Sequence, residues 1–132
     1  MNKQELEEKD QLFLQFDKRG GLLPVIVQEA DSKDVLMLGY INQLALNHTL
    51  ESGLATFWST SRQQLWTKGE TSGDYMHVVS ISVDCDQDAV LYLVRLQGEG
   101  ACHTRNQEGK TRKSCFYRKY NYQQDILEFV EN

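Results

Sequence analysis

The stretch MHVVSISVDCDQDAVLYLV, residues 76–94, predicts two β-strands joined by a short acidic link. Residues 76–83 and 89–94 are rich in the β-branched and large apolar side chains that are typical of strands. The link between them, residues 84–88, alternates aspartates with other residues and contains one of the chain's three cysteines. We therefore expect the chemistry of the protein to be organised around this link.

The link brings two kinds of metal ligand close together. If the extended conformation continues through it, successive side chains point to opposite faces. One face would then carry the carboxylates of Asp84, Asp86 and Asp88, and the other face would carry Cys85. Converging carboxylates repel one another unless a hard cation lies among them, and oxygen ligands suit Mg²⁺ or Ca²⁺. The pattern predicts a divalent-cation site, with a solvated acidic turn as the alternative.

One kind of calcium site can be excluded from the spacing. An EF-hand loop requires Gly at its sixth position and Glu at its twelfth. Counted from Asp84, the sequence has Ala89 and Arg95 at these positions, with a strand-like run between them. The acidic link is therefore not an EF-hand.

The three cysteines, Cys85, Cys102 and Cys115, are candidate zinc ligands. Burial as apolar fillers is the alternative, but Cys102 and Cys115 lie in polar, turn-rich segments. Structural zinc sites have four protein ligands, whereas catalytic sites have three and leave a position for water. A three-cysteine site would either recruit His103 or hold a water whose pKa falls towards about 7, ready to attack an electrophilic carbon.

Length and composition limit the class of protein. With 132 residues, 15.3 kDa and 40% hydrophobic residues, the sequence is typical of one globular domain. A net charge of −5 argues against a nucleic-acid-binding surface. No apolar run approaches the roughly 20 residues of a membrane span, and the first ten residues are too charged for a signal peptide. Because an odd number of cysteines without such a signal favours a reducing compartment, we expect a cytoplasmic protein.

Periodicity and turn residues predict an α+β fold with a mostly antiparallel sheet and one main internal helix. This helix should run between Asn42, as its N-cap, and Gly53, with Leu46 and Leu50 on its apolar face. Further strands are expected at residues 22–28, 35–41, 54–59 and 114–118, and further helices at residues 1–16 and 121–132. The expected divisions are an N-terminal helical extension (1–20), a central domain (21–120) and a C-terminal tail (121–132).

A polar segment, residues 61–73, contains side chains that bind anions or sugars. These are Arg62, Lys68, Thr71 and Ser72, with glycines nearby whose backbone N–H groups can hold a phosphate. The segment lacks the spacing of a P-loop, and an ordinary polar hairpin loop is the alternative. His103 is the candidate general acid or base, since histidine titrates near neutral pH. The basic residues of 105–119 indicate an anionic substrate.

Taken together, the motifs of this sequence resemble those of the phosphoribosyl-AMP cyclohydrolase family, the third-step enzymes of histidine biosynthesis. The resemblance covers about residues 22–117. The motifs that carry it are LPVIVQ (23–28), VLML (35–38), FWSTSR (57–62), LWTKGETSG (65–73), DCDQDA (84–89), ACHT (101–104) and SCFYR (114–118).

The resemblance implies a zinc- and magnesium-dependent hydrolase that opens the adenine ring of N1-(5-phosphoribosyl)-AMP at the N1–C6 bond. The product would be the phosphoribosyl-formimino-aminoimidazole carboxamide ribotide. It also implies an intertwined homodimer whose zinc ligands are shared between chains. Zinc would be bound by Cys85, Cys102 and Cys115, and magnesium by Asp84, Asp86 and Asp88. The proton carrier would be His103, and substrate phosphate and ribose groups would be bound by Arg62, Lys68, Thr71 and Ser72.

The sequence departs from the family pattern in two places. Residues 106–110 are an insertion between the last two cysteines, where the family usually has a shorter link. The fused phosphoribosyl-ATP pyrophosphohydrolase domain is also missing after Tyr117, so we expect a stand-alone enzyme. Two other functions stay open: a binding module whose structural zinc is closed by His103, and a zinc hydrolase for another purine nucleotide.

Overall fold

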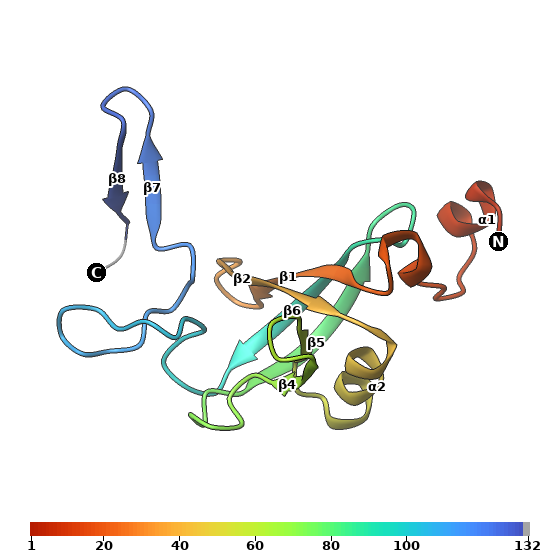
Figure 1. Ribbon diagram of the computed structural model, residues 1–132, viewed down its shortest axis with the longest axis horizontal. Coiled ribbons are helices and arrows are strands. Elements are labelled where there is room, and N and C mark those ends of the chain that lie inside the picture. Colours follow the sequence, from red (N-terminus) through yellow and green to blue (C-terminus); the bar gives the residue numbers. More distant parts are fainter. Residues whose placement is uncertain (131–132) are drawn as a thin grey trace.

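A computed structural model describes residues 1–130 and shows a β-rich body with an arm at each end (Figure 1). The helices are α1 (Lys3–Glu8), the 3₁₀-helix η1 (Phe16–Arg19) and α2 (Gln43–Ser52). The strands are β1 (Leu23–Glu29), β2 (Val35–Ile41), β3 (Thr56–Ser59), β4 (Gln64–Thr67), β5 (Met76–Val83), β6 (Val90–Leu96), β7 (Arg118–Asn121) and β8 (Ile126–Phe129).

The body is built on a four-stranded sheet in the order β2-β1-β6-β5. Its β1–β2 and β5–β6 pairs are antiparallel, and the central pair, β1 with β6, is parallel, with Val25 opposite Val90. The smaller β3–β4 and β7–β8 hairpins are also antiparallel. The predicted α+β class with mostly antiparallel pairing is therefore confirmed.

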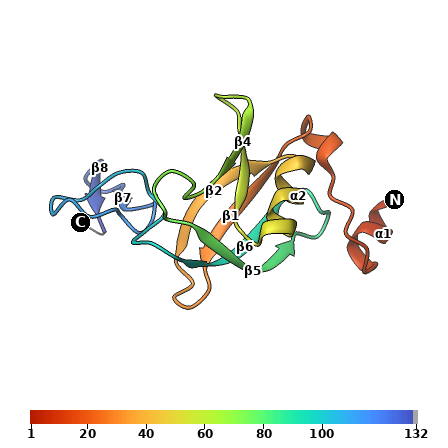
Figure 2. The same cartoon turned by 90° about the horizontal axis from the view of Figure 1, so that it is seen from below.

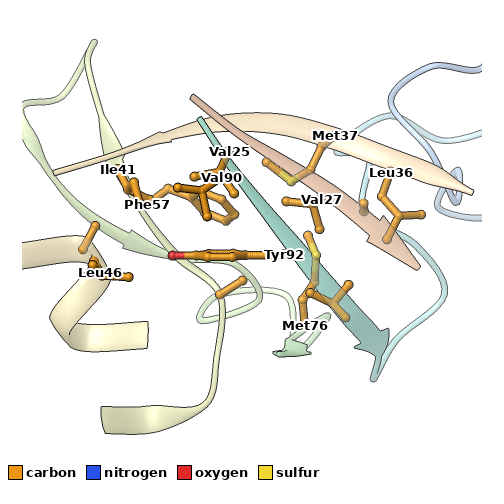
Figure 3. Packing of buried hydrophobic residues seen from close by; sticks show 14 of the residues in the cluster. Val25, Val27, Leu36, Met37, Ile41, Leu46, Phe57, Met76, Val90 and Tyr92 are labelled. Carbon is orange, nitrogen blue, oxygen red and sulfur yellow. The ribbon is translucent and has the colours of Figure 1, made fainter. Parts of the chain in front are cut away.

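The hydrophobic core lies on the face of the sheet that α2 and the β3–β4 hairpin cover (Figures 2 and 3). Tyr92 and Phe57 are fully buried there, with ring centroids 6.4 Å apart. Gly39 on β2 allows this packing, because a Cβ at that position would lie 2.6 Å from the ring of Phe57. Replacing a buried aromatic such as Phe57 by alanine would cost about 3–5 kcal/mol.

The internal helix forms where the sequence predicts it. The Asn42 side chain accepts a hydrogen bond of 2.9 Å from the Ala45 N–H, and Gly53 ends the helix at φ 75°. The predicted apolar face is half right: Leu46 is buried, but Leu50 is 57% exposed. The buried face of the helix consists of Ala45, Leu46 and Thr49.

The N-terminal helix is shorter than predicted. It covers only Lys3–Glu8, where Asn2 and Glu5 form a capping box, and residues 9–15 are irregular. The helix ends early because backbone groups of residues 6–13 bond to a side chain far along the chain. The side chain of Gln87 accepts from the Phe13 N–H and donates to the carbonyls of Leu6 and Gln11, so the segment is bonded to the acidic link rather than to itself.

The C-terminal predictions are wrong in two respects. Residues 114–117 form no strand of a ladder, and the tail forms the β7–β8 hairpin instead of a helix, with residues 131–132 outside the described part. The two strands pair antiparallel, with Arg118 opposite Phe129 and Asn121 opposite Ile126. No helix within residues 1–130 has the length and apolar character needed to cross a membrane.

Candidate active site and metal centres

The acidic link is a tight turn between β5 and β6 rather than an extended segment. Gln87 has a positive φ of 57°, and its N–H donates to the Asp84 carbonyl at 3.1 Å. The Asp84 carboxylate accepts from the N–H groups of Asp88 (2.9 Å) and Ala89 (3.1 Å). One carboxylate oxygen each of Asp84, Asp86 and Asp88 lies within 4.8 Å of the others. The carboxylates converge as expected, but a turn, and not strand alternation, brings them together.

Two basic residues of η1 face this acidic turn. Lys18 lies 3.0 Å from Asp86 and 2.9 Å from Asp88, and Arg19 lies 3.1 Å from Asp88. The Lys18 ammonium holds the pKa of Asp88 far below its ordinary value, whereas burial raises the pKa of Asp84. The turn therefore stabilises negative charge only where a cation already touches it. Three clustered oxygen donors of this kind fit a hard divalent cation.

Cys102 and Cys115 are brought together by a short backbone pairing after β6. The Ala101 N–H donates to the Lys113 carbonyl at 2.9 Å, and the Cys102 N–H donates to the Arg112 carbonyl at 3.1 Å. Gly100 makes this approach possible, because a Cβ there would lie 2.3 Å from the Arg112 carbonyl oxygen.

The edge of β2 anchors the second half of this pairing. The Cys115 N–H donates to the Leu36 carbonyl, and the Ser114 hydroxyl donates to the Val35 carbonyl, each at 2.7 Å. The two cysteines therefore take their positions from the main sheet.

The cysteine pair has no cation bonded to it. Although Cys115 reaches the surface, burial of its thiol and the neighbouring Cys102 together raise the pKa of Cys115 to about 11. Lys68 acts in the opposite sense. The Cys102 sulfur lies 2.9 Å from the Thr104 hydroxyl. Two adjacent thiols, one of them with a raised pKa, are a donor set that zinc converts to thiolates.

The third cysteine lies elsewhere. Cys85 is exposed in the acidic turn, and lines a cavity of about 380 Å³ together with Leu6 and Glu7 of α1. This turn lies beside α1, at the end of the sheet opposite to residues 100–116 (Figure 1). Among residues 1–130, the acidic trio is the one group of three potential ligands that converges. A single chain therefore does not assemble the predicted three-cysteine site.

Two cavities open beside the cysteine pair. The first, which we call the thiol cavity, has about 380 Å³ and is lined by Met37, Leu38, Trp66, Lys68, Ala101, His103, Cys115 and Phe116. The second, the serine cavity, has about 340 Å³ and is lined by Ser59, Ser61, Arg62, Trp66 and His103. Trp66 and His103 line both cavities.

The structure brings together some of the predicted site residues and separates others. His103 and Lys68 meet Cys115 in the thiol cavity, and Arg62 lies in the serine cavity. Thr71 and Ser72 are exposed in the turn after β4 and line neither cavity.

Seven lining residues were not predicted from the sequence: Met37, Leu38, Ser59, Ser61, Trp66, Ala101 and Phe116. Trp66 could have been found from cross-strand pairing, because it lies opposite Phe57 in the β3–β4 hairpin.

The inserted residues close a small hairpin outside both cavities. Asn106 N–H donates to the Lys110 carbonyl at 2.8 Å, and Gly109 turns the chain at φ 80°. Arg105 pairs with Thr111 and so extends the backbone pairing that positions Cys102. The insertion removes no predicted ligand.

Comparisons with known proteins agree on one family. The sequence model described as phosphoribosyl-AMP cyclohydrolase matches residues 37–117. A phosphoribosyl-AMP cyclohydrolase of Archaeoglobus fulgidus is 54% identical over 106 residues, which is 80% of this chain and 91% of that protein. One of Chelativorans sp. is 47% identical over 126 residues, 95% of this chain and 86% of that protein. The histidine biosynthesis bifunctional protein HisIE of Escherichia coli is 51% identical over 111 residues, 84% of this chain and 51% of that protein.

Proposed function

Since this chain belongs to the phosphoribosyl-AMP cyclohydrolase family of histidine-biosynthesis enzymes, we propose that it hydrolyses the N1–C6 bond of N1-(5-phosphoribosyl)-AMP. Water adds its oxygen to C6, the N1–C6 bond breaks, and N1 receives a proton, which opens the six-membered ring. The product is the phosphoribosyl-formimino-aminoimidazole carboxamide ribotide, which keeps the phosphoribosyl group on N1. We assign this activity to the predicted domain at residues 21–120. We also propose that the protein is cytoplasmic.

The observation that carries the proposal is the juxtaposition of the cysteine pair, His103 and the thiol cavity. In this proposal zinc is bound by Cys102 and Cys115 together with Cys85. A bound zinc ion would supply Lewis acidity, which lowers the pKa of bound water to about 7. His103 holds the proton taken from the attacking water and delivers it to N1, because its ring lines both cavities.

The remaining predicted residues keep the roles that the family resemblance implies. Mg²⁺ is assigned to the carboxylates of the acidic turn, whose charge and spacing suit it. Arg62 and Lys68 are proposed as substrate contacts from inside the cavities. Thr71 and Ser72 are proposed as contacts from the neighbouring exposed turn.

We further propose a homodimer in which Cys85 of one chain completes the cysteine pair of the other. Two observations support this arrangement. The turn between β5 and β6, which contains Cys85, lies at the end of the sheet opposite to residues 100–116, which contain Cys102 (Figure 1). The face of the sheet opposite to the core also exposes apolar side chains, among them Ile26 (42%), Leu38 (45%) and Tyr40 (45%).

Turnover of phosphoribosyl-AMP by the purified protein tests the activity. We expect ring opening that disappears after zinc chelation and returns when zinc is added back, with Mg²⁺ also required. A folded, zinc-loaded protein that does not turn over this nucleotide would contradict the proposal and favour another purine nucleotide as substrate. A chain that unfolds on chelation would favour the structural-zinc alternative.

Mixing two inactive variants tests the shared site. In a mixed dimer of Cys85→Ser and Cys102→Ser chains, one zinc site combines only native cysteines and the other combines both substitutions. We expect activity to return on mixing, towards one working site per mixed dimer. If zinc is bound within one chain, every site in the mixture carries a substitution, and no activity will return.

A further inference from the structure

The thiol and serine cavities form one divided binding surface. Trp66 and His103 stand between them and line both. The chain as a whole carries a net charge of −5, yet among residues 1–130 no aspartate or glutamate lines either cavity. The charged lining residues are Lys68 on one side and Arg62 on the other. This surface therefore complements an anion with a planar, apolar part.

Packing against Phe57 fixes the position of the Trp66 ring. Its ring centroid lies 5.6 Å from that of Phe57, which is itself fully buried in the core. The β3–β4 pairing fixes the two residues opposite each other. Leu38 and Phe116 lie in the same cavity. A planar heterocycle placed there would contact the indole and apolar side chains, which is how proteins bind bases without reading their edges.

The serine cavity presents hydroxyl groups and a guanidinium from one tight turn. The Ser59 and Ser61 hydroxyl oxygens lie 3.3 Å apart, and the backbone N–H of Arg62 donates to the Ser59 hydroxyl oxygen at 3.2 Å. Gln63, with φ 53°, closes the turn by donating to the Ser59 carbonyl at 2.8 Å. Arginine and hydroxyl donors grouped in this way suit the oxygens of a phosphate monoester.

Lys68 supplies a second, independent indication of an anionic ligand. It is only 7% exposed and lines the thiol cavity. Within residues 1–130 its ammonium takes part in no hydrogen bond or ion pair that would balance its charge. The side chain is mostly buried while its ammonium group is open to the cavity, where its charge can pair with a ligand. A negatively charged ligand that enters the cavity would provide the missing partner.

From these observations we infer how the nucleotide lies: its purine ring stacks on Trp66 in the thiol cavity, and a 5′-phosphate is bound by Ser59, Ser61 and Arg62 in the serine cavity. This inference rests on the proposed function for the identity of the nucleotide. It makes Trp66 a substrate-binding residue and makes Ser59 and Ser61 phosphate contacts. The ring is thereby presented to the cysteine pair and His103, while the phosphate is kept away from the thiols.

Tryptophan fluorescence can test the arrangement without turnover. The chain has two tryptophans, and Trp58 lines neither cavity, so a Trp58→Phe background leaves Trp66 as the sole reporter. The probes are AMP, adenosine and ribose 5-phosphate, each titrated into the zinc-loaded protein. We expect AMP and adenosine to quench Trp66, AMP to bind at least about 10-fold more tightly than adenosine, and ribose 5-phosphate to leave the fluorescence unchanged.

Two substitutions then separate the two halves of the surface. Arg62→Gln should weaken AMP binding by about 10-fold or more and leave adenosine binding within about twofold. Ser61→Ala should have the same selectivity with a smaller effect. Lys3→Gln, which removes a positive charge from α1, is the matched control and should change neither affinity.

The outcomes distinguish this inference from the proposed reaction. Equal affinity for AMP and adenosine, or an equal loss of both in Arg62→Gln, would overturn the phosphate assignment. An absence of Trp66 quenching by millimolar AMP would overturn the stacking assignment, even in a protein that turns over phosphoribosyl-AMP. If AMP behaves as expected but phosphoribosyl-AMP is not hydrolysed, the binding arrangement stands and the proposed reaction fails.

Discussion

The acidic turn and the cysteine pair are both rich in metal ligands, but they are assembled in opposite ways. The three aspartates lie within five residues of sequence, and one turn brings their carboxylates within 4.8 Å. Cys102 and Cys115 meet only because backbone pairing and the edge of β2 bring two distant segments together. The acidic turn already has ion-paired basic partners from η1, whereas within residues 1–130 the thiols have only the electrostatic influence of Lys68 on Cys115.

This difference has a physical lesson. Carboxylates ionise readily, so a cluster of them can form without its metal if lysine and arginine balance the charge. Burial and the neighbouring Cys102 raise the pKa of Cys115, which disfavours its thiolate until a metal ion such as zinc binds. We therefore expect the acidic turn to respond gradually to substitution and the cysteine site to respond as a unit.

The largest effect is expected from removing a thiol. Cys102→Ser should lower kcat/KM by at least about 10³-fold, because zinc activation of water is lost. Zinc content per chain should fall with it, as metal analysis of the purified protein can show. Cys85→Ser should behave in the same way, although Cys85 belongs to the acidic turn. A Cys85→Ser protein that keeps its zinc and activity would contradict the shared site.

A smaller effect is expected in the acidic turn. Asp86→Asn removes one carboxylate that contacts Lys18 but accepts no backbone hydrogen bond in the turn. The Mg²⁺ concentration for half-maximal activity should rise about 10-fold to 100-fold, with zinc content unchanged. Activity measured over a range of Mg²⁺ concentrations checks this. An unaltered Mg²⁺ requirement would remove Asp86 from the metal site.

An effect of opposite sign is expected from the basic partner of the same turn. Lys18 occupies the position of a counter-cation between Asp86 and Asp88, so it competes with a metal ion for their oxygens. Lys18→Met should lower the half-maximal Mg²⁺ concentration about threefold to tenfold at low salt, and less at high salt. A higher Mg²⁺ requirement in this variant would show that Lys18 supports the metal site instead.

The same contrast explains how much could be predicted from the sequence. Local patterns were sufficient for α2, with its Asn42 and Gly53 caps, and for β1, β2, β5 and β6. They were also sufficient for the convergence of the aspartates, which depends on five consecutive residues. The separation of Cys85 from the other cysteines depends on contacts far apart in the sequence, which residue spacing does not encode.

Long-range contacts also account for the errors. The predicted helix at 1–16 ends early because Gln87, far along the chain, takes the backbone groups of residues 6–13 as partners. The predicted strand at 114–118 fails because Ser114 and Cys115 bond to the edge of β2 at single points rather than along a ladder. The cavity positions of Ser59, Ser61 and Trp66 likewise follow from how the β3–β4 hairpin packs, through Phe57, against Tyr92 of the main sheet.

The smallest effect concerns the anchor of the cysteine segment. Lys113 lies 2.6 Å from Glu29 and 2.9 Å from Asp34, and so ties the segment before Cys115 to the β1–β2 turn. Hydrogen bonding to Lys113 lowers the pKa of Glu29 and of Asp34. Lys113→Met should lower the free energy of unfolding by about 0.5–1 kcal/mol at pH 7, since the pair is partly exposed to solvent.

The pH dependence gives this last prediction its sign. A carboxylate whose pKa is lower in the folded state stabilises the fold above its unfolded pKa, and this contribution is lost as the pH falls through the folded value. The ordinary values are 4.5 for Glu29 and 3.8 for Asp34. The difference in Tm between the native chain and Lys113→Met should therefore be full at pH 7 and shrink below about pH 4.5. A difference that stays constant down to pH 3 would mean that Lys113 stabilises the cysteine segment through packing of its aliphatic chain, and that the acidic turn alone depends on charge.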